Sequence, residues 1–213
     1  SSVFAELTRQ GHFHGPNPLG SIRLFKVDQK SLAFLTFDQI ELLLSEVAKC
    51  ANPYVLIIVR LALSTGARWS EVQNLRRSQV LPDRIVFTRT KNGRNRTVPV
   101  DPELLEQAMS IALPTERLFG NARGAFEVAY ARCGFSTPGQ LTHILRHTFA
   151  SHFVMAGGDL RTLRDILGHS DIHTTMRYAH LAPEHLDKAL HLNPLALWSG
   201  SRQTVVNPAD ESP

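Results

Sequence analysis

Hydrophobic residues recur along the chain at spacings that predict helices. Thr36 and Gln39 fit a capping box, and the apolar residues after them recur three and four positions apart through about Lys49. A second helix is expected after Pro53, which suits a first helical position, because the run YVLIIVRLALS is apolar nearly all round and Gly66 supplies a left-handed stop. The pattern predicts a main domain that opens at Thr36 and buries the second helix.

A β-hairpin is predicted next. The segment RIVFTRTKNGRNRTVPV alternates around Asn92-Gly93, a pair that favours a tight hairpin turn, and Lys91 is placed beside that turn. Beyond Asp101 the pattern is helical again, with helices expected at about 102–112, 122–132, 142–156, 159–167, 171–180 and 183–191. The expected fold class is therefore α+β, mainly α with a small antiparallel β-sheet.

The two ends of the chain differ from the middle. Residues 3–10 look like the last turns of a helix, and the segment GHFHGPNPLG after them is rich in Gly and Pro, which break regular structure. We therefore interpret residues 1–35 as the end of an upstream domain plus a linker, and residues 36–195 as the main domain. Residues 196–213 are mostly polar and fit a flexible tail or an arm that docks on a partner.

Composition narrows the setting. The net charge is only +4, but residues 60–99 contain nine Lys or Arg against two acids, which favours a polyanionic partner. Cys50 and Cys133 are too few and too far apart for a disulfide framework, so a reducing intracellular compartment is expected. The start of the chain lacks a signal-peptide pattern and no apolar run is long enough to span a bilayer, so we expect a soluble protein with no membrane partner.

Four segments carry candidate chemistry: TGARWSE, TKNGRNRTVPV, LTHILRHTFASH and LGHSDIHTTMRYAH. On a helix, His143 and Arg146 share a face, and His147 lies four residues from His143, a spacing that zinc hydrolases use. A zinc site is disfavoured because the glutamate of such sites is missing and a guanidinium lies between the ligands. His169 and His173 repeat the spacing and meet the same objection. No metal or other cofactor is expected.

Taken together and in order, these segments resemble the tyrosine recombinase family. The sequences TGARWSE and THILRHTFASH are similar to those of temperate-phage integrases in particular. The resemblance covers roughly residues 35–195. It implies that the main domain is a catalytic domain and that residues 1–35 end a core-binding domain. The residues that fall on the family's catalytic positions are Arg68, Lys91, His143, Arg146, His169 and Tyr178.

The resemblance implies a concrete reaction. Arg68 and Arg146 would clamp a DNA phosphate with planar guanidiniums, and Tyr178 would attack it to form a 3′-phosphotyrosine. A phenol has a pKa of about 10, so Tyr178 needs help from the cationic pocket and from a base, for which His143 is the candidate. His169 would hydrogen-bond the phosphate, and Lys91 would protonate the departing 5′ oxygen.

Other residues near these motifs are assigned supporting or structural roles. Glu71 is expected to orient Arg68, and Trp69 to pack in the core. We interpret His147 as a structural histidine and His180 as an exposed one.

The resemblance also implies partners and a place. We expect double-stranded DNA carrying attachment sites, a homotetramer on paired sites that the C-terminal tail helps to tether, and a cytoplasmic setting in a bacterial host. A host DNA-bending protein and an excision factor are further candidate partners. The product would be phage DNA integrated into, or excised from, the host chromosome.

Two kinds of alternative stay open. A type IB topoisomerase or a telomere-resolving enzyme would use the same chemistry without recombining sites. A non-catalytic DNA-binding relative, or a helical metalloprotein built on the paired histidines, belongs to another class. The intact tyrosine argues against the non-catalytic DNA-binding relative. The missing glutamate argues against the helical metalloprotein.

Overall fold

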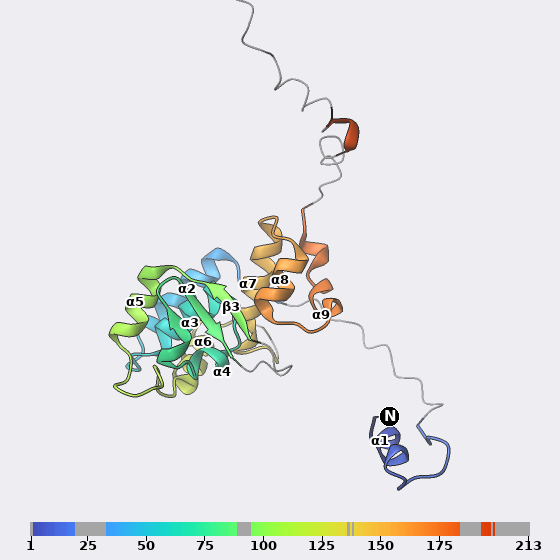
Figure 1. Ribbon diagram of the computed structural model, residues 1–213. Helices are drawn as coiled ribbons and strands as arrows, with labels where there is room; N and C mark the ends of the chain where they lie inside the picture. The colour runs from blue at the N-terminus through green and yellow to red at the C-terminus, as the bar shows by residue number, and fades with distance from the viewer. Residues whose placement is uncertain are drawn as a thin grey trace, which may run out of the picture. The chain divides into compact units, whose positions relative to one another are not determined.

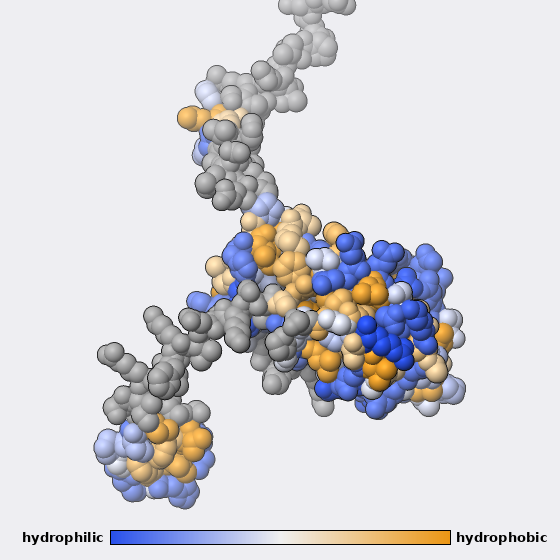
Figure 2. Space-filling view, turned by 180° about the vertical axis from the view of Figure 1, so that it is seen from behind, coloured by the Kyte–Doolittle hydropathy of each residue, from blue (hydrophilic) through white to orange (hydrophobic). Residues whose placement is uncertain are grey.

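The computed structural model describes residues 2–19, 33–88, 95–135, 137, 139–183, 193–196 and 198. The chain divides into two compact units, Ser1–Leu32 and Ala33–Pro213. The smaller unit contains helix α1 (Ser2–Arg9), in which Arg9 pairs with Glu6 one turn earlier. Its surface combines apolar and polar areas (Figure 2), and Val3 is 66% exposed.

The larger unit confirms the predicted fold class, because it is mainly helical with one small sheet (Figure 1). Its α-helices are α2 (Phe37–Ala48), α3 (Val55–Thr65), α4 (Trp69–Gln73), α5 (Pro102–Ser110), α6 (Arg123–Arg132), α7 (His143–Met155), α8 (Leu160–Leu167) and α9 (Ile172–Met176). Two short 3₁₀ helices are η1 (Arg77–Gln79) and η2 (Ala179–Leu181), and the strands are β1 (Val80–Leu81), β2 (Arg84–Phe87) and β3 (Arg96–Pro99).

Helix α3 forms the centre of the core, as its all-round apolar sequence predicts. It contacts α2, α4, α5, α6 and α7. The predicted capping box at the start of α2 is present, since the Thr36 and Gln39 side chains each accept from the other's backbone N–H. Gly66 ends α3 with φ 64°, also as predicted. Helix α3 begins at Val55 rather than at Pro53, because the Asn52 side chain accepts from the N–H of Tyr54 and holds a turn there.

The sheet is antiparallel, with strand order β1-β2-β3. Strands β2 and β3 form the predicted hairpin in a register that pairs Phe87 with Arg96. Strand β1 and helix α4 were not predicted, because each spans only two to five residues and carries too little periodicity. Lys91 and the Asn92-Gly93 turn lie outside the described residues, as do the helix expected at 183–191 and most of the tail.

Helices α7, α8 and α9 lie side by side at one end of the larger unit (Figure 1). The sequence predicted one helix over residues 171–180, but α9 ends at Met176. The backbone tightens there, since the N–H of Tyr178 bonds to the carbonyl of Thr175, and η2 follows. No helix among the described residues is long and apolar enough to cross a membrane.

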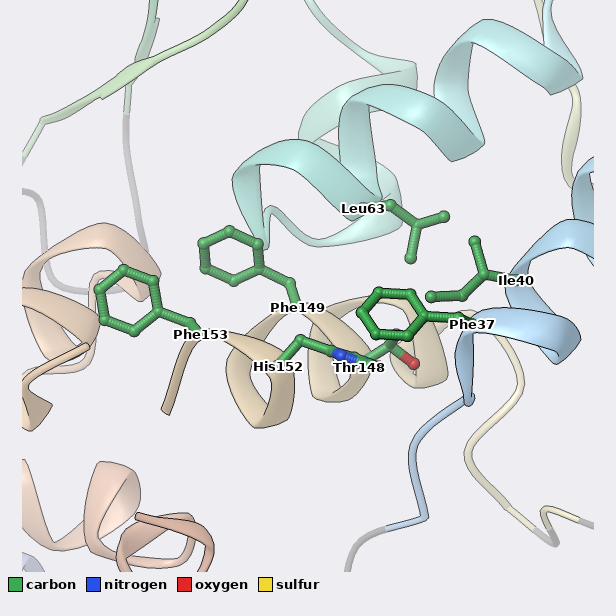
Figure 3. A pocket seen from close by; sticks show the side chains of 7 residues that line it. All are labelled: Phe37, Ile40, Leu63, Thr148, Phe149, His152 and Phe153. Carbon is green, nitrogen blue, oxygen red and sulfur yellow. The ribbon is translucent and has the colours of Figure 1, made fainter. Parts of the chain in front are cut away.

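The segment that leads into α2 is tied to α7. The Thr148 hydroxyl accepts from the N–H of Leu35 at 2.9 Å, and Nε2 of His152 lies 2.8 Å from the Leu35 carbonyl. Beside this contact is an apolar pocket of about 290 Å³ between α2, α3 and α7 (Figure 3). The ring of Phe37 lies over His152 with centroids 4.6 Å apart, so aromatic packing helps to position α7.

Candidate active site

Helix α7 carries Arg146 into the interior, where its side chain is 5% exposed. Its Nη1 donates to the carbonyl of Gly66 at 3.0 Å, and its Nη2 donates to the carbonyl of Leu167 at 2.8 Å. Both carbonyls lie at helix C-termini, of α3 and α8, where the helix dipole favours a cation. Burial and the nearby Arg68 lower the pKa of Arg146 to about 9, which leaves it a cation at neutral pH.

Glu71 holds two arginines in place from the first turn of α4. It accepts from the Arg68 N–H at 2.8 Å and from Arg68 Nη1 at 3.3 Å, so the predicted contact between these two residues is present. It also accepts from both terminal nitrogens of Arg96, at 3.0 and 2.7 Å. Burial raises the pKa of Glu71, but the hydrogen bonds and charge of Arg96 more than reverse this, so Glu71 stays ionised.

Sequence reasoning did not single out Arg96. It is 8% exposed, its Nε donates to the carbonyl of Ile166 at 2.8 Å, and its guanidinium lies 4.5 Å from the centre of the Phe87 ring. The signal that could have found it is the alternation of β3, in which Arg96 and Val98 face inward. Through these contacts, Arg96 links the sheet to α4 and to the end of α8.

His169 follows α8 and is held by α9. Its Nδ1 lies 2.9 Å from the hydroxyl of Thr175, a fully buried residue that sequence reasoning also missed. Burial, then the charges of Arg146 and Arg68, lower the pKa of His169 to about 4. At neutral pH the imidazole is therefore neutral, and Thr175 orients its ring.

Tyr178 closes this group from the end of α9. It is 3% exposed, and its hydroxyl lies 2.7 Å from Nδ1 of His147 on α7. His147, which we interpreted as a satisfied structural histidine, is hydrogen-bonded here. Among the described residues it contacts the Tyr178 hydroxyl, whereas the expected base His143 does not. The pKa of Tyr178 is raised because burial outweighs the charges of Arg146 and Arg177.

The remaining predicted residues fall as follows. His143 is the first residue of α7, is exposed, and has its ring centroid 6.4 Å from that of His147. Lys91 lies outside the described residues. Trp69 packs against Phe126 with ring centroids 4.8 Å apart, and His180 is exposed, both as predicted. Within the described ranges, no group of three or more His, Cys, Asp or Glu could hold a metal ion.

The site is strongly cationic. Three guanidiniums, those of Arg68, Arg96 and Arg146, meet the single carboxylate of Glu71, which leaves two net positive charges. Glu71 accepts from the guanidiniums of both Arg96 and Arg68, and Arg146 donates only to backbone carbonyls, so the excess positive charge is not neutralised within this group. The excess charge favours an anion. A phosphodiester fits, because two guanidiniums can neutralise its oxygens and stabilise the further charge that develops during displacement. The buried Tyr178 phenol, on which the charge of Arg146 acts, is the candidate nucleophile.

Comparisons with known proteins identify the family. Residues 33–185 match the model of the phage integrase family, so the chain belongs to that family. A putative integrase of Pseudomonas phage Pf1 is 50% identical over 196 residues, which is 92% of this chain and 59% of that protein. The integrase of Haemophilus phage HP1 is 50% identical over 198 residues, which is 92% of this chain and 57% of that protein.

Solved structures show the same fold. The catalytic domain of bacteriophage HP1 integrase matches with a TM-score of 0.73 and 51% identity, covering 78% of this chain and 97% of that domain. A lambda integrase dimer bound to a core site matches with a TM-score of 0.64 and 19% identity, covering 82% of this chain and 70% of that chain, which is a likeness of fold alone. The chain spans about 57–60% of the length of the curated phage integrases that it matches.

Proposed function

We propose that this chain is the catalytic part of a site-specific DNA recombinase that cleaves and rejoins DNA through a 3′-phosphotyrosine at Tyr178. The observation that carries the proposal is the buried Tyr178 hydroxyl, on which the charge of Arg146 acts, in a site whose net charge is positive. Family membership over residues 33–185 supports the same reaction.

The reaction is a transesterification. Arg68 and Arg146 hold the non-bridging phosphate oxygens, with His143 and His169 beside them as hydrogen-bond donors. The Tyr178 oxygen attacks phosphorus, and the P–O5′ bond breaks while Lys91 supplies a proton to the leaving oxygen. A 5′-hydroxyl from a second strand then attacks the phosphotyrosine and releases Tyr178. The bond energy is conserved in the intermediate, and arginines supply the charge, so neither ATP nor a metal ion is required.

The partner in this proposal is double-stranded DNA carrying attachment sites, met in the cytoplasm of a bacterial host. The DNA-bound dimer of lambda integrase has the same fold and supports a DNA partner. We propose a homotetramer on paired sites, tethered by residues 196–213, with a host DNA-bending protein and an excision factor as further partners. Integration or excision of phage DNA is the resulting activity, as the phage relatives' names suggest.

The test is a covalent trapping experiment. The chain is incubated at high concentration with nicked duplexes that carry a randomised core sequence, and an SDS-resistant, protease-sensitive adduct is sought and mapped by mass spectrometry. We expect the adduct at Tyr178, none with Tyr178→Phe, and an undiminished yield with the control Tyr54→Phe, whose half-buried phenol lies outside the site. No wild-type adduct on any core sequence would favour a non-catalytic DNA-binding relative.

The same assay separates the enzymatic alternatives. A recombinase joins the trapped strand to the 5′-hydroxyl of a second duplex with matching sequence. Relaxation of supercoiled DNA without joining two duplexes would indicate a topoisomerase, and closure of hairpin ends would indicate a telomere-resolving enzyme.

A further inference from the structure

The Tyr178 hydroxyl has one hydrogen-bond partner among the described residues, and that partner is His147. The two residues come from different elements, since His147 lies on α7 and Tyr178 follows α9. Nδ1 of His147 lies 2.7 Å from Oη of Tyr178, a normal distance for an O–H···N hydrogen bond. His147 is half-buried and Tyr178 is 3% exposed, so this contact is largely shielded from bulk water.

We propose that His147 is a further catalytic residue, which receives the proton of Tyr178 during cleavage and returns it during rejoining. This inference rests on the function proposed above. In cleavage, the bond between Oη and phosphorus forms while the P–O5′ bond breaks. The phenol proton moves to Nδ1 of His147, and the 5′ oxygen takes a different proton, from Lys91. In rejoining, a 5′-hydroxyl attacks phosphorus, and His147 reprotonates Oη as it departs.

The proton affinity of His147 depends on whether a phosphate is bound. Burial lowers the pKa of His147 to about 4, and the nearby charges of His143, Arg177 and Arg146 add to the effect. His147 is therefore neutral and able to accept a proton at neutral pH, but it is a weak base. A bound phosphate brings negative charge among the same cations and so raises the proton affinity of the imidazole.

The nucleophile is matched to this arrangement. Burial raises the pKa of Tyr178, so the free protein keeps a phenol, which is a poor nucleophile. DNA binding strengthens the base at the same moment that it delivers the electrophile. The site is thus inert until a phosphate occupies it, which protects the tyrosine from unproductive reactions.

The first experiment compares single-turnover rates of adduct formation on a nicked duplex for the wild type and His147→Asn. The Oδ1 of asparagine can replace Nδ1 as hydrogen-bond acceptor for Tyr178 but cannot take up its proton. We expect the variant to bind DNA normally and to react about 10²-fold more slowly, the lower end of the usual general-base contribution. His173→Asn is the matched control, because His173 is an exposed histidine whose side chain is 86% accessible.

The pH dependence separates proton transfer from mere positioning. If His147 is the base, the rate of adduct formation by His147→Asn should rise continuously with pH, since solvent must then remove the Tyr178 proton. The wild-type rate should instead level off once His147 is neutral. Imidazole added to His147→Ala should restore part of the rate. A substrate with a bridging 5′ sulfur, which departs without a proton, should not rescue either variant.

The outcomes are distinguishable. A wild-type adduct together with a His147→Asn rate within threefold of wild type at every pH would overturn the role of His147 and leave the proposed function standing. No wild-type adduct at all would overturn both. Should the variants fail to fold, histidine NMR of Tyr178→Phe decides instead. The pKa of His147 should rise when DNA is added, and an unchanged pKa would count against the proposal.

Discussion

Arg96 offers the sharpest test of how this site is built. It is the residue that connects β3 to α4 and α8, through two hydrogen bonds to Glu71 and one to the Ile166 carbonyl. Replacing Arg96 with methionine keeps an unbranched apolar chain as far as the position of Nε and removes all three donors. Glu71 then keeps only its contacts with Arg68. Its half-buried carboxylate loses Arg96, the partner that makes the shorter hydrogen bonds to it through its side chain.

The size of the effect follows from burial. Removing one partner of a buried ion pair costs about 3–5 kcal/mol. The Glu71 side chain is 18% exposed and retains Arg68, so water and the second arginine offset part of this. We expect Arg96→Met to lower the free energy of unfolding by about 2–4 kcal/mol. In a domain of this size that corresponds to a fall in Tm of about 5–15 °C.

The assay is urea unfolding followed by far-UV circular dichroism, with Arg84→Met as the control. Arg84 is on the neighbouring strand and pairs with Asp83, but both side chains are about half exposed, 49% and 55%. Such a surface pair contributes little to stability, because water screens both charges. Equal losses for the two variants, or a loss below about 1 kcal/mol for Arg96→Met, would refute the argument that the buried Glu71 network holds the site together.

The pH dependence of the same variant gives an internal check. Glu71 has a folded-state pKa below its unfolded value, so it contributes stability that is present above the unfolded pKa and is lost as the pH falls through the folded pKa. Without Arg96 the pKa of Glu71 returns toward or above its ordinary value. The Glu71 contribution to acid destabilisation should therefore disappear in Arg96→Met, leaving a shallower loss below about pH 4.5.

Three further predictions follow from the packing of the site. Gly66→Ala should lower the free energy of unfolding by about 2–4 kcal/mol in urea titrations, because a Cβ there would lie 2.4 Å from the Phe149 ring and φ is 64°; a neutral substitution would show that the contact relaxes freely. Thr175→Val should slow adduct formation about 5- to 10-fold with little change in Tm, since Nδ1 of His169 loses its partner. His147 and His169 both have folded-state pKa values of about 4, below the unfolded value, so the unfolded chain binds more protons. Stability should therefore fall as the pH drops from about 6.5 toward 4, and a flat profile over that window would contradict their burial as neutral groups.

The sequence by itself determined much of this protein. Local rules that link a few neighbouring residues set the start of α2, the end of α3 and the pairing of β2 with β3. The roles of Thr36, Gln39 and Gly66 could therefore be assigned correctly. The family could be identified as well, because motifs such as TGARWSE and THILRHTFASH, and their order along the chain, can be read without a structure.

Only the tertiary structure decided which groups meet. His143 and His147 are one turn apart on the same face of α7, so periodicity cannot say which of them contacts Tyr178, 31 residues beyond His147. The partnership of Arg96 with Glu71 likewise spans 25 residues and depends on how β3 packs against α4. The pKa of Tyr178 shows the reason most clearly. Neighbouring charges lower it and burial raises it, and burial is a property of packing that no local pattern contains.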